Sequence, residues 1–132
     1  MKVIHTSGTR KQSKARATIK AGTGIIRINK QLLESFQPKL ARMKIMEPLL
    51  LSGEVAKKVD VNINILGGGW TSQADAARLA LAKGLIEFTG NKNLKKEFLE
   101  YDRHLLVADV RRNEPHKPND SKPRAKRQKS YR

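Results

Sequence analysis

Carboxylates are absent from the first 33 residues of the chain, and Glu34 is the first to occur. Those 33 residues carry eight lysines and arginines, and residues 111–132 carry nine against Glu114 and Asp120. The segment between them, residues 34–110, is almost neutral, with eleven basic and ten acidic side chains. The net charge of +16 therefore lies at the two ends of the 132-residue chain, where it opposes compaction unless a polyanion neutralises it.

Nucleic acid is the polyanion that this charge distribution fits best, because lysines and arginines displace the counterions condensed on its phosphates. An anionic membrane surface is a second candidate. Plain solubility is a third, although a merely solvated surface usually mixes both signs of charge. No apolar run is long enough to span a membrane, and we expect no membrane partner. The chain has no cysteine, which fits a reducing compartment, and we expect a cytoplasmic protein.

The basic N-terminal segment shows the alternation that is typical of strands. In residues 11–20 one face is polar and mostly basic: Gln12, Lys14, Arg16, Thr18 and Lys20. The other face is small or apolar. The glycines of residues 21–24 predict a turn, after which residues 25–29 return as the second strand of a hairpin. Lysines also protect edge strands from unwanted pairing, so the basic face does not by itself establish a ligand.

The middle of the chain predicts a helix followed by a strand. In the helix, residues 37–53, Pro38 suits the first turn, Pro48 is expected to end or kink it, and Gly53 to stop it. A broad apolar stripe is expected to be buried: Leu40, Met43, Ile45, Met46 and Leu50. Residues 59–65 alternate valine and isoleucine with polar side chains, which predicts a half-buried strand.

Three glycines at 67–69 join that strand to a second predicted helix, which ends at Gly90. Ser72 is predicted as its N-cap, with Asp75 as an acidic variant of the capping box. Helical spacing predicts a buried face: Ala74, Ala77, Leu81, Leu85 and Phe88. Small side chains should let the helix lie close against a sheet: Ala76, Ala77, Ala80 and Gly84.

The core pattern stops after Val110. Before it, residues 93–101 predict an amphipathic helix, and the apolar residues 104–110 fit an extended segment. Residues 111–132 contain three prolines and almost nothing to bury, so burial cannot offset an ordering cost of about 1–2 kcal/mol per residue. We therefore expect an α+β body at residues 1–110, a small sheet packed with helices, and an extended basic tail at residues 111–132 that orders on RNA. On the amphipathic helix the apolar side is expected to hold Leu94, Phe98 and Tyr101.

No group of residues suits catalysis or metal binding. The three histidines are scattered over unrelated segments: His5, His104 and His116. The carboxylates Glu97, Glu100 and Asp102 alternate with basic side chains, which fits helical ion pairing better than acid–base chemistry. We therefore expect no enzyme activity, no metal, no cofactor and no small-molecule substrate.

The GGGWTSQ segment at residues 67–73 has two interpretations. Free amides at a helix start, with the positive end of the helix dipole, suit a phosphate, and Gln73 and Arg78 lie close enough to extend such a site. A tight, closely packed turn accounts for the same glycines equally well. The pattern alone leaves both open.

Residues 8–30, 47–53, 59–85 and 128–132 together resemble one family in their order and spacing. They are similar to ribosomal protein nine of the small subunit, the universal S-nine family, over essentially the whole chain. The SYR ending resembles the archaeal and eukaryotic branch. The resemblance implies a fold like domain two of ribosomal protein S-five, with a left-handed crossover, in the head of the small subunit. The implied partners are small-subunit ribosomal RNA, neighbouring ribosomal proteins and the tRNA in the peptidyl site.

The basic ends and the resemblance together nominate RNA-binding residues. In the body, the residues expected to bind ribosomal RNA are Arg10, Lys11, Lys14, Arg16, Lys20, Gly67, Gly68, Gly69, Gln73 and Arg78. In the tail they are Arg111, Arg112, Lys117, Lys122, Arg124, Lys126 and Arg127. The resemblance assigns the tRNA contact to Arg132, with Lys129 and Tyr131 nearby. A base stacked on the Tyr131 ring would contribute roughly 1–3 kcal/mol.

Two other classes of protein stay open. A free-standing basic protein that packages nucleic acid would bind duplex DNA as well as RNA and would not be confined to one particle. A nucleic-acid-modifying enzyme would need a base, a nucleophile or a metal cluster, which the sequence does not offer.

Overall fold

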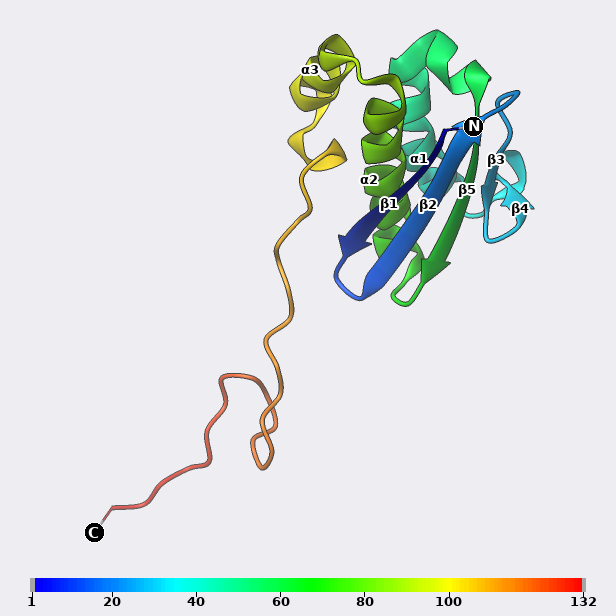
Figure 1. The fold of residues 1–132 in the computed structure, drawn as a ribbon. Helices are drawn as coiled ribbons and strands as arrows, with labels where there is room; N and C mark the ends of the chain where they lie inside the picture. Colours follow the sequence, from blue (N-terminus) through cyan, green and yellow to red (C-terminus); the bar gives the residue numbers. More distant parts are fainter. Residues whose placement is uncertain (1, 132) are drawn as a thin grey trace.

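The computed structural model describes residues 2–131, and its body is mixed α+β (Figure 1). Five strands form one sheet in the order β1-β2-β5-β3-β4. The strands are β1 (Val3–Arg10), β2 (Ser13–Ala21), β3 (Ile26–Ile28), β4 (Gln31–Leu32) and β5 (Val59–Leu66). The helices are α1 (Lys39–Ser52), α2 (Trp70–Thr89) and α3 (Lys92–Tyr101), with 3-10 turns η1 (Leu33–Ser35), η2 (Gly53–Lys58) and η3 (Arg103–Leu105).

The hairpin expected between residues 11–20 and 25–29 is wrong. β2 pairs antiparallel with β1 on one side and with β5 on the other, and β3 runs parallel to β5. The hairpin turn is instead at Lys11 and Gln12, with Lys11 at a positive φ of 53°. The glycine segment after β2 is held by β5, because Asp60 Oδ1 accepts hydrogen bonds from the backbone N–H groups of residues 23, 24 and 25.

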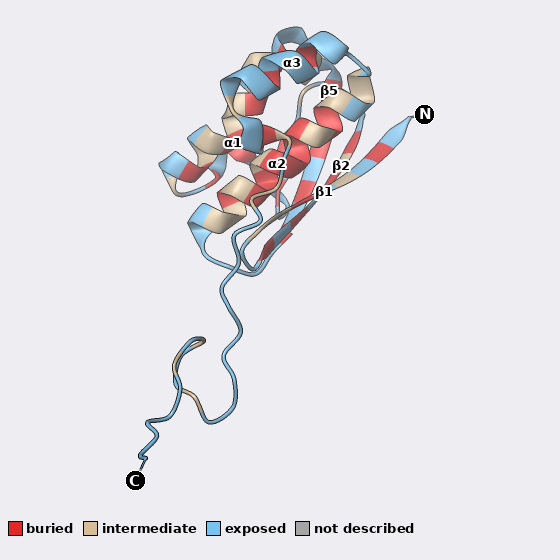
Figure 2. Cartoon of the chain, turned by 90° about the vertical axis from the view of Figure 1, so that its left-hand side faces the viewer, coloured by how far each residue is buried: buried red, intermediate tan, exposed pale blue. Residues whose placement is uncertain are grey.

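One face of the sheet is apolar and covered by α1 and α2 (Figures 1 and 2). The predicted alternation of residues 59–65 is confirmed in β5, which buries Val59, Val61, Ile63 and Ile65. The close approach of α2 is also confirmed. A Cβ on Gly8 of β1 would collide with the backbone of Ala76 and Ala80, and one on Gly84 would meet Ile19 of β2. The small residues therefore set the distance between helix and sheet.

α1 forms at the predicted place, but Pro48 does not end it and the predicted apolar stripe is not buried as a whole. The helix continues through Pro48, which is buried within it. The predicted stripe is rotated, because Leu40, Met43 and Leu50 are all more than half exposed. Ile45 is the one predicted member that is fully buried, and the buried residues of the helix are Ala41, Ile45, Pro48 and Ser52.

The start of α2 differs from the prediction, whereas its end agrees. Gly69 is the N-cap, and no side chain in the described part of the chain caps this helix. The predicted capping box is therefore wrong, and Ser72 lies inside the first turn. Asp75 instead accepts a hydrogen bond from Lys44 of α1 at 3.3 Å. Gly90 ends the helix in the left-handed conformation, with φ at 65°.

The C-terminal part of the body is held by α3. Leu94 and Phe98 are buried as predicted, but Tyr101 is more than half exposed. Residues 104–110 do not form a strand, since η3 takes up the first two and the rest has no regular structure. Residues 111–131 contain no helix or strand, are mostly exposed and lead away from the body (Figures 1 and 2). Over residues 2–131, no helix has the length and apolarity needed to cross a bilayer.

Candidate nucleic-acid interface

The basic face predicted on β2 is present. Lys14, Arg16 and Lys20 are exposed, and the residues on the opposite face of the strand are buried beneath the helices: Ser13, Ala15, Ala17 and Ile19. The sequence therefore placed these three cations correctly on the side of the sheet that faces away from α1 and α2.

The three glycines at 67–69 pack against the turn between β1 and β2. Ser13 Oγ and Gln73 Nε2 both donate hydrogen bonds to the Gly67 carbonyl oxygen, at 2.9 and 3.1 Å. Gly67 and Gly68 have positive φ angles, and a Cβ on Gly67 would lie 2.6 Å from the carbonyl oxygen of Gln12. Two of the three glycines are thus explained by the tight, closely packed turn.

The start of α2 also keeps the features that suit a phosphate. The first backbone N–H groups of a helix have no acceptor within it, and here no described side chain takes that place. Gly69 has open space around its Cα, and Lys11 is exposed in the turn between β1 and β2. Trp70, which was not among the predicted site residues, is 46% exposed at the same helix start. Its signal in the sequence was a lone tryptophan directly after three glycines.

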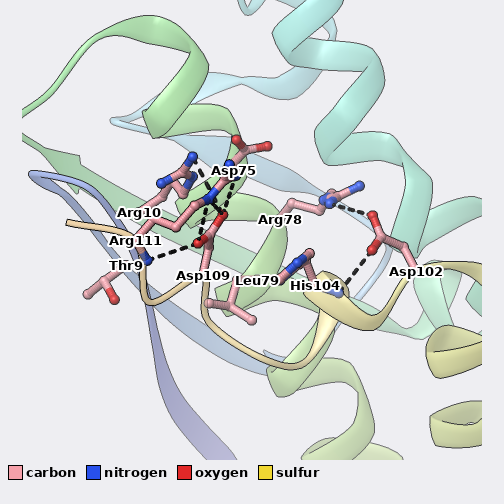
Figure 3. A pocket seen from close by; sticks show the side chains of 9 residues that line it. All are labelled: Thr9, Arg10, Asp75, Arg78, Leu79, Asp102, His104, Asp109 and Arg111. Atoms are coloured by element: carbon pink, nitrogen blue, oxygen red, sulfur yellow. Dashed lines mark hydrogen bonds and ion pairs between the residues drawn. The ribbon is translucent and has the colours of Figure 1, made fainter. Parts of the chain in front are cut away.

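Two arginines that were expected to bind RNA lie among carboxylates of the body (Figure 3). Arg78 is only 11% exposed and pairs with Glu47 of α1 and with Asp102, the latter at 3.0 Å. Arg10 is 15% exposed and lies 3.5 Å from the carboxylate of Asp109. The Arg78 guanidinium joins α2 to α1 and to the end of α3, and that of Arg10 joins β1 to the segment just before the tail. Which arginines pair inside the body depends on tertiary packing, and no local sequence signal reveals it.

Two carboxylates of this cluster, Asp102 and Asp109, have lowered pKa values. Hydrogen bonds from the side chain and the backbone N–H of Arg111 hold the pKa of Asp109 far below its usual range. Burial raises the pKa of Asp102, but the His104 backbone N–H and the Arg78 guanidinium outweigh it and lower the pKa. Arg111, expected to bind RNA, is therefore engaged at the start of the tail.

The remaining tail residues are exposed, and their contacts are weak. Arg124 pairs with Glu114 at 2.9 Å, Arg127 Nε donates to the Asn119 carbonyl oxygen at 3.2 Å, and Arg112 reaches Thr9 at 3.4 Å. Exposed ion pairs of this kind contribute at most about 1 kcal/mol, so phosphates can replace them. The other expected ligands are fully accessible: Lys117, Lys122, Lys126, Lys129 and Tyr131. Arg132 lies outside the described residues.

Within residues 2–131, no three His, Asp or Glu side chains are placed together so that they could hold a metal ion.

Comparisons with known proteins agree over nearly the whole chain. A family model described as ribosomal protein S9/S16 matches residues 8–132. Curated relatives named small ribosomal subunit protein uS9 include those of Methanococcus maripaludis strains S2 and C7 and of Methanococcus vannielii. Each is 58% identical over 134 aligned residues, which cover 100% of this chain and 100% of the relative.

Proposed function

Because the chain belongs to the ribosomal protein S9/S16 family, we propose that it binds small-subunit ribosomal RNA through both its body and its basic tail. As a member of this family it is a structural, non-enzymatic constituent of the small subunit, located in cytoplasmic ribosomes. Its partners there are ribosomal RNA and neighbouring ribosomal proteins. RNA binding by particular residues and contact with tRNA are the steps that we add.

The exposed tail is the observation that carries the proposal. Residues 111–131 lack regular structure and lead away from the body (Figure 1), and residues 111–132 hold nine basic side chains against two acidic ones. Such a segment buries too little to order itself, whereas pairing with phosphates releases counterions and supplies the ordering free energy. The cations Lys14, Arg16 and Lys20 on β2, and the amides at Gly69 and the start of α2, supply further phosphate contacts on the body.

We assign the tRNA contact to the tip of the tail, as the family resemblance implies. The Tyr131 ring is 85% exposed, which leaves it open for a base to stack on it. Lys129 lies two residues before it, and Arg132 follows it. We further propose that the tip reaches the peptidyl site from the head of the subunit.

The fold type implied by the resemblance belongs to the same proposal. β3 and β5 are parallel neighbours, and the chain passes from one to the other through α1. This connection supports a body like domain two of ribosomal protein S-five, for which we propose a left-handed crossover.

Reconstituted small subunits test the proposal directly. A chain lacking residues 129–132 should be incorporated into subunits to the same extent as the full chain, as measured by sedimentation. The affinity of these subunits for tRNA in the peptidyl site should fall about tenfold. Tyr131→Phe keeps the ring and should retain tRNA affinity, whereas Tyr131→Ala should not. Unchanged tRNA affinity in the truncated subunits would refute the contact. A chain lacking residues 111–132 should bind ribosomal RNA weakly and enter subunits poorly.

A further inference from the structure

We propose that the uncovered face of the sheet is a docking surface for the ribose–phosphate backbone of double-helical RNA. The inference rests on the proposed RNA binding, and it specifies which face of the body binds and which form of RNA. We call this surface the open face and define it by six exposed residues: Lys14, Arg16 and Lys20 of β2, Arg27 of β3, and Asn62 and Asn64 of β5.

Strand register brings these side chains together. All three helices lie on one side of the sheet, and the opposite side is uncovered within residues 2–131 (Figure 2). Arg16 is the register partner of Asn64, and Asn62 is the register partner of Arg27 on the next strand. Lys14 to Lys20 spans six residues of β2, or about 20 Å. The open face is therefore an array of cations and amides that crosses three neighbouring strands.

The cations of the open face are only partly compensated by the protein itself, because Asp60 of β5 is the register partner of Lys20 and interacts with its charge. Within the described residues, none of its four lysines and arginines forms a salt bridge. Asp60 is the one carboxylate at an outward position of β2, β3 or β5, and its oxygen Oδ1 is occupied by three backbone N–H groups of residues 23–25. These hydrogen bonds lower the pKa of Asp60 and keep it at the edge of the array. The surface thus carries an excess of positive charge that a phosphate backbone complements.

A hollow beside β3 extends the array. Arg27, Lys30, Leu32, Asn62 and Asn64 line it, so two cations and two amides surround one depression. None of these five residues was predicted as a site residue, because Arg27 and Lys30 lie far from the asparagines along the chain.

The chemistry of the open face favours a helical backbone over unpaired bases. Surfaces that hold single strands present aromatic side chains for stacking, and no outward position of β2, β3 or β5 is aromatic. Double-stranded RNA is recognised instead through phosphates and 2′-hydroxyl groups across its minor groove. Lysines and arginines suit the phosphates, and the Asn62 and Asn64 amides both donate to and accept from a 2′-hydroxyl.

Matched variants of the full chain test the assignment. The double variant Arg16→Gln/Arg27→Gln removes two cations from the open face. The control variant Lys39→Gln/Lys96→Gln removes two exposed lysines from the helices, so the two variants have the same net charge as each other. With a 20-base-pair RNA duplex, we expect the first to bind about tenfold more weakly. Its slope of log affinity against log salt should fall by about 1.4–1.8, and the second should change little.

Substitution of the two asparagines tests whether the open face discriminates between RNA and DNA duplexes. The double variant Asn62→Ala/Asn64→Ala should bind the RNA duplex several-fold more weakly. Its affinity for a DNA duplex of the same sequence should not change, because DNA lacks the 2′-hydroxyl. Protection from acetylation gives a readout that needs no variant, since bound duplex RNA should shield Lys14 and Lys20 but not Lys39.

The outcomes distinguish the inference from the function on which it rests. If the chain binds RNA but the open-face variant loses no more affinity than the helix variant, the open face is not the RNA surface and is left for another partner, such as a protein. If the open-face variant loses affinity for single-stranded RNA but not for the duplex, the assignment to double-helical RNA is wrong. Failure of the full chain to bind any RNA would remove the proposed function as well.

Discussion

The hydroxyl of Ser13 donates a hydrogen bond to the carbonyl oxygen of Gly67 across 2.9 Å, and Ser13 is fully buried. This bond fixes the start of β2 to the turn that precedes α2. Gly68 lies against the same serine at a positive φ of 69°. The basic strand and the amides at the start of α2 are thereby held in a fixed relation.

Gly68→Ala should lower the free energy of unfolding by about 2 kcal/mol, because its Cβ would collide with Ser13 in a backbone conformation that alanine disfavours. Gly69→Ala is the matched control, since no atom lies within 4 Å of its added Cβ and its φ is −88°. Because Gly69 is the N-cap of α2, where alanine is less favourable than glycine, the substitution should cost at most about 1 kcal/mol. Urea denaturation of both variants measures the difference, and equal losses would contradict the packing described here.

Arg78→Met should destabilise the body by about 2 kcal/mol at neutral pH, because Glu47 and Asp102 lose the guanidinium that they share. Partial exposure of both carboxylates keeps the loss below that of a fully buried pair. Arg124→Met also removes an arginine paired with a carboxylate, but its side chain is exposed. We expect no measurable change in its free energy of unfolding, because solvent screens an exposed pair. Thermal and chemical denaturation should separate the two variants clearly.

Stability should be constant from pH 7 to about pH 5 and decrease as the pH falls below about 4. The pKa values of Asp60, Asp102 and Asp109 are lower in the folded protein than in the unfolded chain, so folding favours their charged forms. That contribution is complete above the unfolded pKa, near 4, and is lost as the folded groups take up protons.

Asp60→Asn is the control for this pH dependence, because the amide keeps an oxygen for the backbone N–H groups but does not titrate near pH 4. Repulsion within a chain of net charge +16 also grows in acid. The test is therefore the difference in acid sensitivity between the two proteins, measured by urea denaturation at each pH. A variant that loses stability in acid as steeply as the parent would exclude Asp60 as a contributor.

The single tryptophan, Trp70, should report RNA at the start of α2. It is exposed directly after the three glycines, so a bound phosphate backbone should change its fluorescence. We expect the change to persist in a chain lacking residues 111–132 and to require a higher RNA concentration in Lys11→Gln. A signal that disappears with the tail would show that RNA does not approach this helix start.

Elements with a strong local pattern could be predicted from the sequence. β5 alternates regularly, and α2 repeats its apolar side chains at helical spacing up to Gly90. β1 was missed because the residues that face α2 include Thr6 and Gly8, which do not form an apolar pattern. Gly8 is there because the helix backbone comes so close, and that is a property of the packed pair rather than of the strand.

In the candidate site, too, only the features with a local pattern could be predicted from the sequence. Alternation placed Lys14, Arg16 and Lys20 on an exposed face, since a strand's two faces are encoded locally. Alternation does not say which strands are neighbours, so Arg27 could not be placed beside Asn62. Nothing in the sequence around Arg10 and Arg78 distinguishes them from arginines that bind RNA, because only the tertiary fold brings carboxylates to them.

The position of β5 between β2 and β3 has a consequence for synthesis of the chain. The middle strand of the sheet is made after both of its neighbours, and 30 residues separate the end of β3 from the start of β5. The hairpin of β1 and β2 can form early, but it exposes an unpaired edge until Leu66 has left the translating ribosome. The nascent chain therefore passes through a stage at which aggregation through that edge competes with completion of the sheet.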